Sequence, residues 1–167
     1  DVLRSYARHF ETDEVIPEEL IARLRAASKF NTGFATTEYL AACFLDMAWH
    51  GENATDIEDV PAFEEAIAHQ IGNTTVVDPR YKSSYFQHIF SDDHYSAGYY
   101  VYIWAEVLDA DAFEAFKENG LFDPATAKAF RQNILERGGS ADPMALYRAF
   151  RGRDPEVQAL LRNRGLN

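Results

Sequence analysis

The chain has 167 residues and a formal net charge of −11, and its apolar fraction of 47% is ordinary for a globular protein. This acidic balance argues against a nucleic-acid partner, because phosphate backbones attract basic surfaces. No apolar stretch reaches the ~18–20 residues that cross a bilayer, so we expect no membrane association. The single cysteine, Cys43, stands in an apolar run, and we expect it to be buried as a small hydrophobic residue.

Proline and glycine divide the chain into helical segments. An aspartate precedes proline at positions 123, 142 and 154, which is typical of a helix start, because the carboxylate accepts hydrogen bonds from first-turn N–H groups. Glycines follow several segments, where a left-handed residue often ends a helix. In chain order we predict helices over 1–11, 17–30, 36–50, 60–71, 97–108, 110–119, 124–137, 143–151 and 155–164.

These segments predict an all-α fold and a single domain over residues 1–167. The segment 36–50 is apolar nearly all round, and we expect it to be the central buried helix. Residues 72–84 and 88–96 interrupt the helices, and 74–77 are the one candidate for brief strand pairing. Most arginines near the C-terminus are expected to lie on the surface, because cations suit helix C-termini.

Six of the nine tyrosines fall within 22 residues, between positions 81 and 102. Tyr95 precedes a helix predicted to begin near Ala97, and Tyr99 and Tyr102 lie on its first turns, where residues three apart face the same way. Their hydroxyls are able to converge and donate to a carbonyl oxygen. Gly98 would let a backbone or a ligand approach. Packing as ordinary core residues is the simpler interpretation of the same pattern.

His88 and His94 bracket Asp92 and Asp93, and histidine and carboxylate are metal ligands. Their spacing matches no zinc pattern, so we expect a solvated loop and no metal site. The sequence also lacks the His-Glu-x-x-His zinc helix, the Gly-x-Ser-x-Gly nucleophile turn, a phosphate loop and a dinucleotide fingerprint. The residue pattern alone therefore indicates a helical domain with a tyrosine-rich loop.

Two neighbouring stretches are more specific. Residues 80–90 read Arg-Tyr-Lys-Ser-Ser-Tyr-Phe-Gln-His-Ile-Phe, and residues 95–104 read Tyr-Ser-Ala-Gly-Tyr-Tyr-Val-Tyr-Ile-Trp. They resemble the thimet oligopeptidase-like zinc metallopeptidases, and most of all their bacterial peptidyl-dipeptidase (dipeptidyl carboxypeptidase) branch. The stretches 6–9, 45–50 and 164–167 are similar to the same branch, so the resemblance runs over essentially the whole chain.

This resemblance implies the C-terminal portion of a zincin-like helical metallopeptidase, forming part of one wall of the substrate channel. In that family the zinc ligands precede this portion, so we expect zinc in the full-length parent and none bound by this chain alone. The chain begins at Asp1 inside what reads as a helix, and we expect a piece that is inactive by itself and exposes apolar patches. The expected partners are peptide substrates and the upstream zinc-binding part. The expected location is the cytoplasm, with the periplasm as the alternative.

The resemblance also implies roles for four residues. His88 matches the histidine that hydrogen-bonds substrate backbone near the scissile bond, and Tyr102 matches the tyrosine that stabilises the oxyanion of the tetrahedral intermediate. Tyr95 matches a loop tyrosine that orients the substrate and shares the oxyanion role, and Tyr99 lines the same channel. The family's loop before Tyr95 is often glycine-rich, whereas residues 91–94 here read Ser-Asp-Asp-His.

The function implied by the resemblance is a zinc peptidase that releases dipeptides from peptide C-termini. A hydroxyl donor at the developing oxyanion favours the transition state over the ground state, and tyrosine suits this role because its side chain is neutral at pH 7. The alternative is a non-catalytic helical module that binds peptides or a partner protein, since tyrosine is enriched at binding hot spots.

Overall fold

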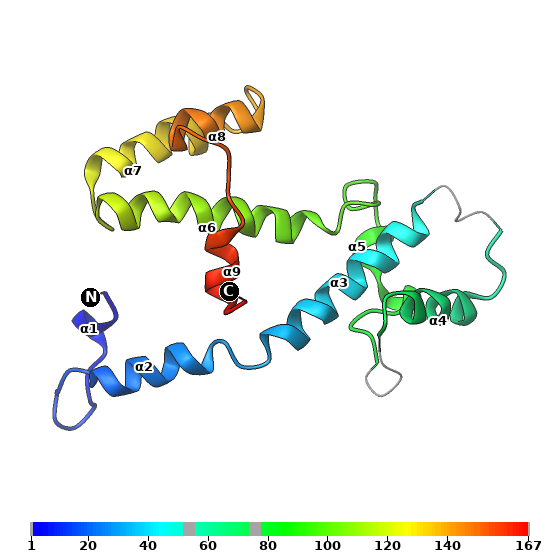
Figure 1. The fold of residues 1–167 in the computed structure, drawn as a ribbon, viewed down its shortest axis with the longest axis horizontal. Helices are drawn as coiled ribbons and strands as arrows, with labels where there is room; N and C mark the ends of the chain where they lie inside the picture. The colour runs from blue at the N-terminus through cyan, green and yellow to red at the C-terminus, as the bar shows by residue number, and fades with distance from the viewer. Residues whose placement is uncertain (1, 52–55, 74–77, 167) are drawn as a thin grey trace. The chain divides into compact units, whose positions relative to one another are not determined.

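A computed structural model describes residues 2–51, 56–73 and 78–166, and these residues are mostly helical (Figure 1). Backbone contacts divide the chain into two compact units, Asp1–Thr32 and Gly33–Asn167. The described residues hold helices, short helical turns and an isolated bridge, which confirms the all-α prediction. The strand candidate at 74–77 lies outside the described residues, and the single-domain prediction stays a prediction.

The first unit holds α1 (Val2–Tyr6) and α2 (Glu18–Ala27). The predicted helix 1–11 ends early, because the chain after α1 turns back on itself. The Ile16 N–H donates to the Ala7 carbonyl oxygen at 3.0 Å, next to the bridge between positions 8 and 15. This turn satisfies backbone groups that a longer helix would have satisfied internally.

The second unit is organised along helix α6, which packs against α7 and α9 (Figure 1). The π-helical turn η2 continues α7 and packs against α8. In chain order its elements are α3 (Thr32–Trp49, whose first residue closes the first unit), α4 (Val60–Gln70), the 3₁₀ turn η1 (Ser83–Tyr85), α5 (Gln87–Phe90), α6 (Val101–Asn119), α7 (Pro124–Phe130), η2 (Arg131–Leu135), α8 (Pro143–Arg151) and α9 (Gln158–Arg164).

Helix α6 differs from the sequence prediction in two ways. The predicted helices 97–108 and 110–119 are one continuous helix, because neither glycine nor proline separates them and Asp109 is tolerated within a helix. The helix begins at Val101 instead of 97. Ala97 has a φ of 55°, which belongs to the left-handed region and cannot start a right-handed helix.

Two of the three aspartate–proline pairs start helices as predicted. Asp123 and Asp142 each accept a hydrogen bond from the N–H three residues on, at 2.7 Å. The third aspartate, Asp154, does not cap α9, because its carboxylate binds the guanidinium of Arg148 and α9 begins later. The local capping signal is therefore outcompeted where a cation lies within reach.

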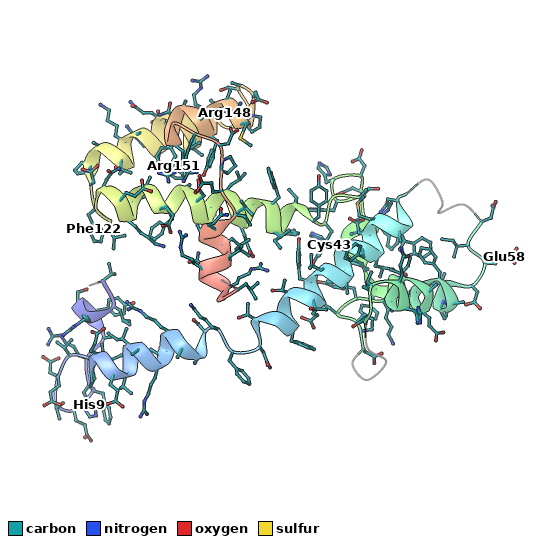
Figure 2. All side chains as sticks on the ribbon, viewed as in Figure 1. His9, Cys43, Glu58, Phe122, Arg148 and Arg151 are labelled. Carbon is teal, nitrogen blue, oxygen red and sulfur yellow. The ribbon has the colours of Figure 1, made fainter. Side chains whose placement is uncertain are left out.

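One face of α3 carries the residues that bind the rest of the second unit. Positions 39, 42, 43, 46 and 49 recur at helical spacing and face the same core. Cys43 is buried there as predicted (Figure 2), and burial raises the pKa of its thiol. The prediction that this helix is buried all round is wrong on the opposite side, since Phe44 is 51% exposed.

A buried carboxylate on α6, that of Asp111, ties α8 and the chain after it to α6. Arg153 binds both carboxylate oxygens at 2.7 and 3.1 Å, and the Tyr147 hydroxyl donates to the same carboxylate. Most of the C-terminal arginines were expected at the surface, but the side chain of Arg151 (Figure 2) is only 6% exposed. Its guanidinium donates two hydrogen bonds to Glu118, at 3.0 and 3.1 Å. Arg151 and Arg153 therefore stabilise the fold through ion pairs and are more than polar surface residues.

The turn before α6 is tight at Gly98. A Cβ atom at this position would lie 3.3 Å from the His94 carbonyl oxygen and 3.4 Å from the Tyr95 Cα. Backbone thus approaches this glycine closely, which is one of the two uses that the sequence predicted for it.

We predict an acid-dependent loss of stability from Asp111. Burial raises the pKa of its carboxyl, but the bonds from Arg153 and Tyr147 outweigh burial and leave the pKa below its usual value. A lowered pKa stabilises the folded state above about pH 4, and this contribution is lost as the pH falls. Asp111→Asn should lower the free energy of unfolding by about 3 kcal/mol at pH 7 and by less at about pH 2. Urea unfolding measures both, and equal losses would contradict the prediction.

We also predict that Gly98→Ala destabilises the protein. Crowding against the backbone should destabilise the folded state by ~1–3 kcal/mol. Alanine also lowers the conformational entropy of the unfolded chain, which favours folding by ~0.4–1 kcal/mol. The net loss in the free energy of unfolding is therefore about 1 kcal/mol. Gly33→Ala is the matched control, because nothing lies within 4 Å of a Cβ there. Thermal unfolding compares the two variants, and a Gly98→Ala protein as stable as the control would show that the loop moves aside at no cost.

Candidate functional site

A histidine and a tyrosine from two helices meet at the surface of the second unit. His88 lies on the short helix α5, and Tyr102 lies on the first turn of α6. The His88 Nε2 and the Tyr102 hydroxyl oxygen are 2.8 Å apart, which is hydrogen-bond distance. Both side chains are exposed, and that of Tyr102 retains 39% exposure. A ligand therefore has direct access to this pair.

Tyr95, on the loop between the two helices, completes the group. Its ring lies almost parallel to that of Tyr102, with centroids 5.6 Å apart and an interplanar angle of 8°. It also lies against His88, with ring centroids 4.2 Å apart. The structure thus brings His88, Tyr95 and Tyr102 together, as the convergent interpretation of the sequence expected.

Tyr99 is buried against two of these rings, those of His88 and Tyr102. It is 5% exposed, and its ring meets those of Tyr102 and Phe86 edge-on, with centroids 5.3 and 5.1 Å away. Burial, followed by the bond to Tyr81, raises the pKa of Tyr99 to about 12. The core interpretation therefore describes Tyr99, while its role in lining a channel stays a prediction.

The electrostatics keep the exposed phenol neutral. The interaction with the Tyr95 hydroxyl, with a smaller contribution from burial, raises the pKa of Tyr102 above its usual value. An ordinary tyrosine is already protonated at pH 7, and a raised pKa extends that range upward. Tyr102 is therefore a neutral phenol, and no phenolate, toward whatever occupies the site.

Helix α3 fixes the backbone that carries these rings. The Tyr39 hydroxyl donates to the Tyr99 carbonyl oxygen at 2.8 Å and accepts the Ile103 N–H at 3.2 Å. That second bond satisfies one of the N–H groups that a helix start leaves without an internal partner. Seven residues later on the same face of α3, Asp46 accepts the N–H groups of Ala97 and Tyr99 at 3.0 and 2.8 Å.

Sequence reasoning did not assign Tyr39 and Asp46 to the site. The sequence signal for Asp46 is a carboxylate in an otherwise apolar run, four residues before His50. A charge at such a position requires partners when it is buried. The partners themselves, however, lie 51 and 53 residues away along the chain, and no local pattern identifies them.

The described residues do not fit a zinc site. Asp92, Asp93 and His94 form the group whose ligand atoms lie within 4.8 Å of one another. All three are exposed, and His94 Nδ1 lies 3.1 Å from Asp92 Oδ1. A catalytic zinc takes three protein ligands that are oriented by further hydrogen bonds, whereas these are consecutive residues of a solvated loop. His88 is bonded to Tyr102 and does not join them.

The chain matches peptidase family M3 over residues 1–166. It is 41% identical to the dipeptidyl carboxypeptidase of Escherichia coli strain K12 over an alignment of 168 positions, which covers 99% of this chain and 24% of that protein. It is 37% identical to oligopeptidase A of the same strain, covering 99% and 24%. It is 33% identical to saccharolysin of Saccharomyces cerevisiae, covering 98% and 23%. The chain spans about a quarter of the length of these curated relatives.

These similarities confirm the resemblance inferred from residues 80–104, and the helical fold agrees with it. None of the helices in the described part of the chain combines the length and the apolar character that crossing a bilayer demands. Because the family match covers nearly every residue, it includes both the tyrosine-rich loop and the helices around it. This chain belongs to peptidase family M3.

Proposed function

We propose that this chain forms part of the substrate-channel wall of a zinc metallopeptidase that releases dipeptides from peptide C-termini. The observation that carries the proposal is the exposed pair of His88 and Tyr102, joined at 2.8 Å with Tyr95 stacked against both. The family match supports a peptidase, and a relative named dipeptidyl carboxypeptidase supports the dipeptide product. The cytoplasmic location stays a prediction.

The zinc ligands are proposed to come from another part of the longer protein, and the poor fit of the described residues to a zinc site supports this. The zinc-binding part of the longer protein is therefore the proposed partner, and peptides are the proposed substrates. In this arrangement the chain contributes groups that bind the peptide and stabilise developing charge, and the isolated chain cleaves nothing.

Tyr102 is the proposed oxyanion donor. When water adds to the scissile carbonyl, negative charge develops on the carbonyl oxygen, and a neutral hydroxyl placed at that oxygen binds the transition state more strongly than the substrate. Tyr95 lies parallel to Tyr102 at 5.6 Å, so its hydroxyl is the proposed second contact to the same part of the substrate. Exposure of Tyr102 permits the peptide to reach it.

His88 sets the direction of the Tyr102 proton. If Nε2 carries the imidazole proton, His88 donates to the Tyr102 oxygen and leaves the phenolic hydrogen free for the substrate. In the other tautomer, Tyr102 donates to His88 and its hydrogen is not available. We propose that the first arrangement holds in the working enzyme and that the exposed His88 ring also contacts substrate backbone.

The central test is Tyr102→Phe in the full-length protein. Removing the hydroxyl should lower kcat for release of a C-terminal dipeptide ~10²–10³-fold, the usual effect of losing one oxyanion donor. KM should change little, because the hydroxyl contributes mainly in the transition state. Stability should be preserved, since the hydroxyl is exposed. Mass spectrometry of the products, steady-state kinetics and thermal unfolding provide the three readouts.

Tyr100→Phe is the matched control, because Tyr100 is a neighbouring tyrosine with 52% exposure that has no part in the proposed mechanism. It should keep wild-type kcat. A Tyr102→Phe enzyme that retains full kcat would contradict the proposal, and so would a full-length protein that binds peptides without cleaving them, which would support a non-catalytic binding module.

A further inference from the structure

The carboxylate of Asp46 on α3 has no solvent-exposed surface, yet both of its oxygens are hydrogen-bonded. Its Oδ1 accepts the Ala97 N–H at 3.0 Å and lies 2.8 Å from His50 Nδ1, and its Oδ2 accepts the Tyr99 N–H at 2.8 Å. Three donors from two segments therefore converge on one buried side chain. A buried carboxylate persists only when such bonds replace its lost hydration.

Two of these donors belong to the turn that leads from Tyr95 into α6. Ala97 has a φ of 55°, and a non-glycine residue in this region costs on the order of 1–3 kcal/mol and persists only where its surroundings enforce it. Asp46 bonds the N–H of this strained residue and that of Tyr99. The carboxylate thus enforces the backbone conformation directly between Tyr95 and Tyr102.

His50 completes the arrangement from the position directly after α3. It lies four residues after Asp46, and its ring also contacts Phe90 at a centroid distance of 5.6 Å. Phe90 closes α5, the helix that carries His88. Asp46 and His50 therefore touch both segments that present the site: the turn before α6 and the end of α5.

We propose that Asp46 is a positioning residue for the oxyanion donors, acting through the backbone of residues 97–99 and supported by His50. Asp46 itself touches no substrate. Its function is to hold Tyr95 and Tyr102 at the separation and orientation at which their hydroxyls reach one carbonyl oxygen. This inference rests on the function proposed above for those two tyrosines.

The test is Asp46→Asn in the full-length enzyme. Asparagine keeps the shape but directs an NH₂ donor at one of the positions where a donor already lies. A displacement of about 1 Å at a reacting group costs up to ~10²-fold in rate, so we expect kcat to fall ~10–100-fold while KM changes less than about threefold. Amide exchange over residues 95–102 should accelerate, because one of the two N–H groups that bind Asp46 loses its acceptor.

A double-mutant cycle separates positioning from a general structural effect. If Asp46 acts through Tyr102, then Asp46→Asn should lower kcat by less than about threefold in a Tyr102→Phe background. Full, additive loss in that background would overturn the proposal. Asp111→Asn is the matched control, since it also alters a buried carboxylate of the second unit, and it should reduce stability while leaving kcat unchanged.

If the Asp46→Asn protein does not fold, Asp46→Glu tests the proposal instead. This substitution keeps the charge and both acceptor oxygens but shifts them by one methylene. A folded Asp46→Glu enzyme should lose about tenfold in kcat, and wild-type kcat would overturn the proposal. The two proposals are contradicted by different results. A fully active Tyr102→Phe enzyme would contradict the proposed function of Tyr102. An inactive Tyr102→Phe enzyme together with a fully active Asp46→Asn enzyme would contradict only the proposed role of Asp46.

Discussion

The structure of the second unit around the site depends on a buried carboxylate, that of Asp46, whose hydrogen bonds come from backbone N–H groups and a histidine instead of a lysine or arginine. Asp46 accepts two backbone N–H groups of the turn before α6 and one bond from His50, all on the interior side of α3. Breaking this arrangement would leave a charge in a low-dielectric interior, which costs several kcal/mol. Two effects therefore hold the turn against α3. One is the strength of the hydrogen bonds to Asp46, and the other is the free-energy cost of burying the Asp46 carboxylate without them.

This constraint explains why tyrosines close together in sequence serve different purposes. Tyr99 gives its N–H to Asp46 and its carbonyl oxygen to the Tyr39 hydroxyl, so its ring is drawn into the core. Tyr102 lies three residues on and its ring rests edge-on against Tyr99, which leaves its hydroxyl at the surface. Tyr95 comes from outside the helix and meets Tyr102 from the loop side. The buried Tyr99 ring thus acts as a rigid support for the exposed Tyr102 ring.

Sequence reasoning succeeded where the information is local. The aspartate caps at 123 and 142 and the burial of Cys43 follow from patterns of a few residues. It failed where distant partners decide. The early end of α1, the competition for Asp154 and the burial of Arg151 each depend on a partner that the local pattern does not contain. The roles of the site residues came from family resemblance, because a tyrosine-rich turn by itself equally suits a core.

The two buried carboxylates of the second unit illustrate why one of them relates to the site and the other does not. Asp111 is paired with guanidinium groups on long side chains, which adjust to small shifts and hold whole helices together. Asp46 is paired with backbone N–H groups, which have no side-chain freedom, so any change in the carboxylate moves the chain itself. The chain that moves carries Tyr95 on one side and Tyr102 on the other. A carboxylate that binds backbone within a strained turn therefore controls geometry at its surface, whereas one that binds cations controls mainly stability.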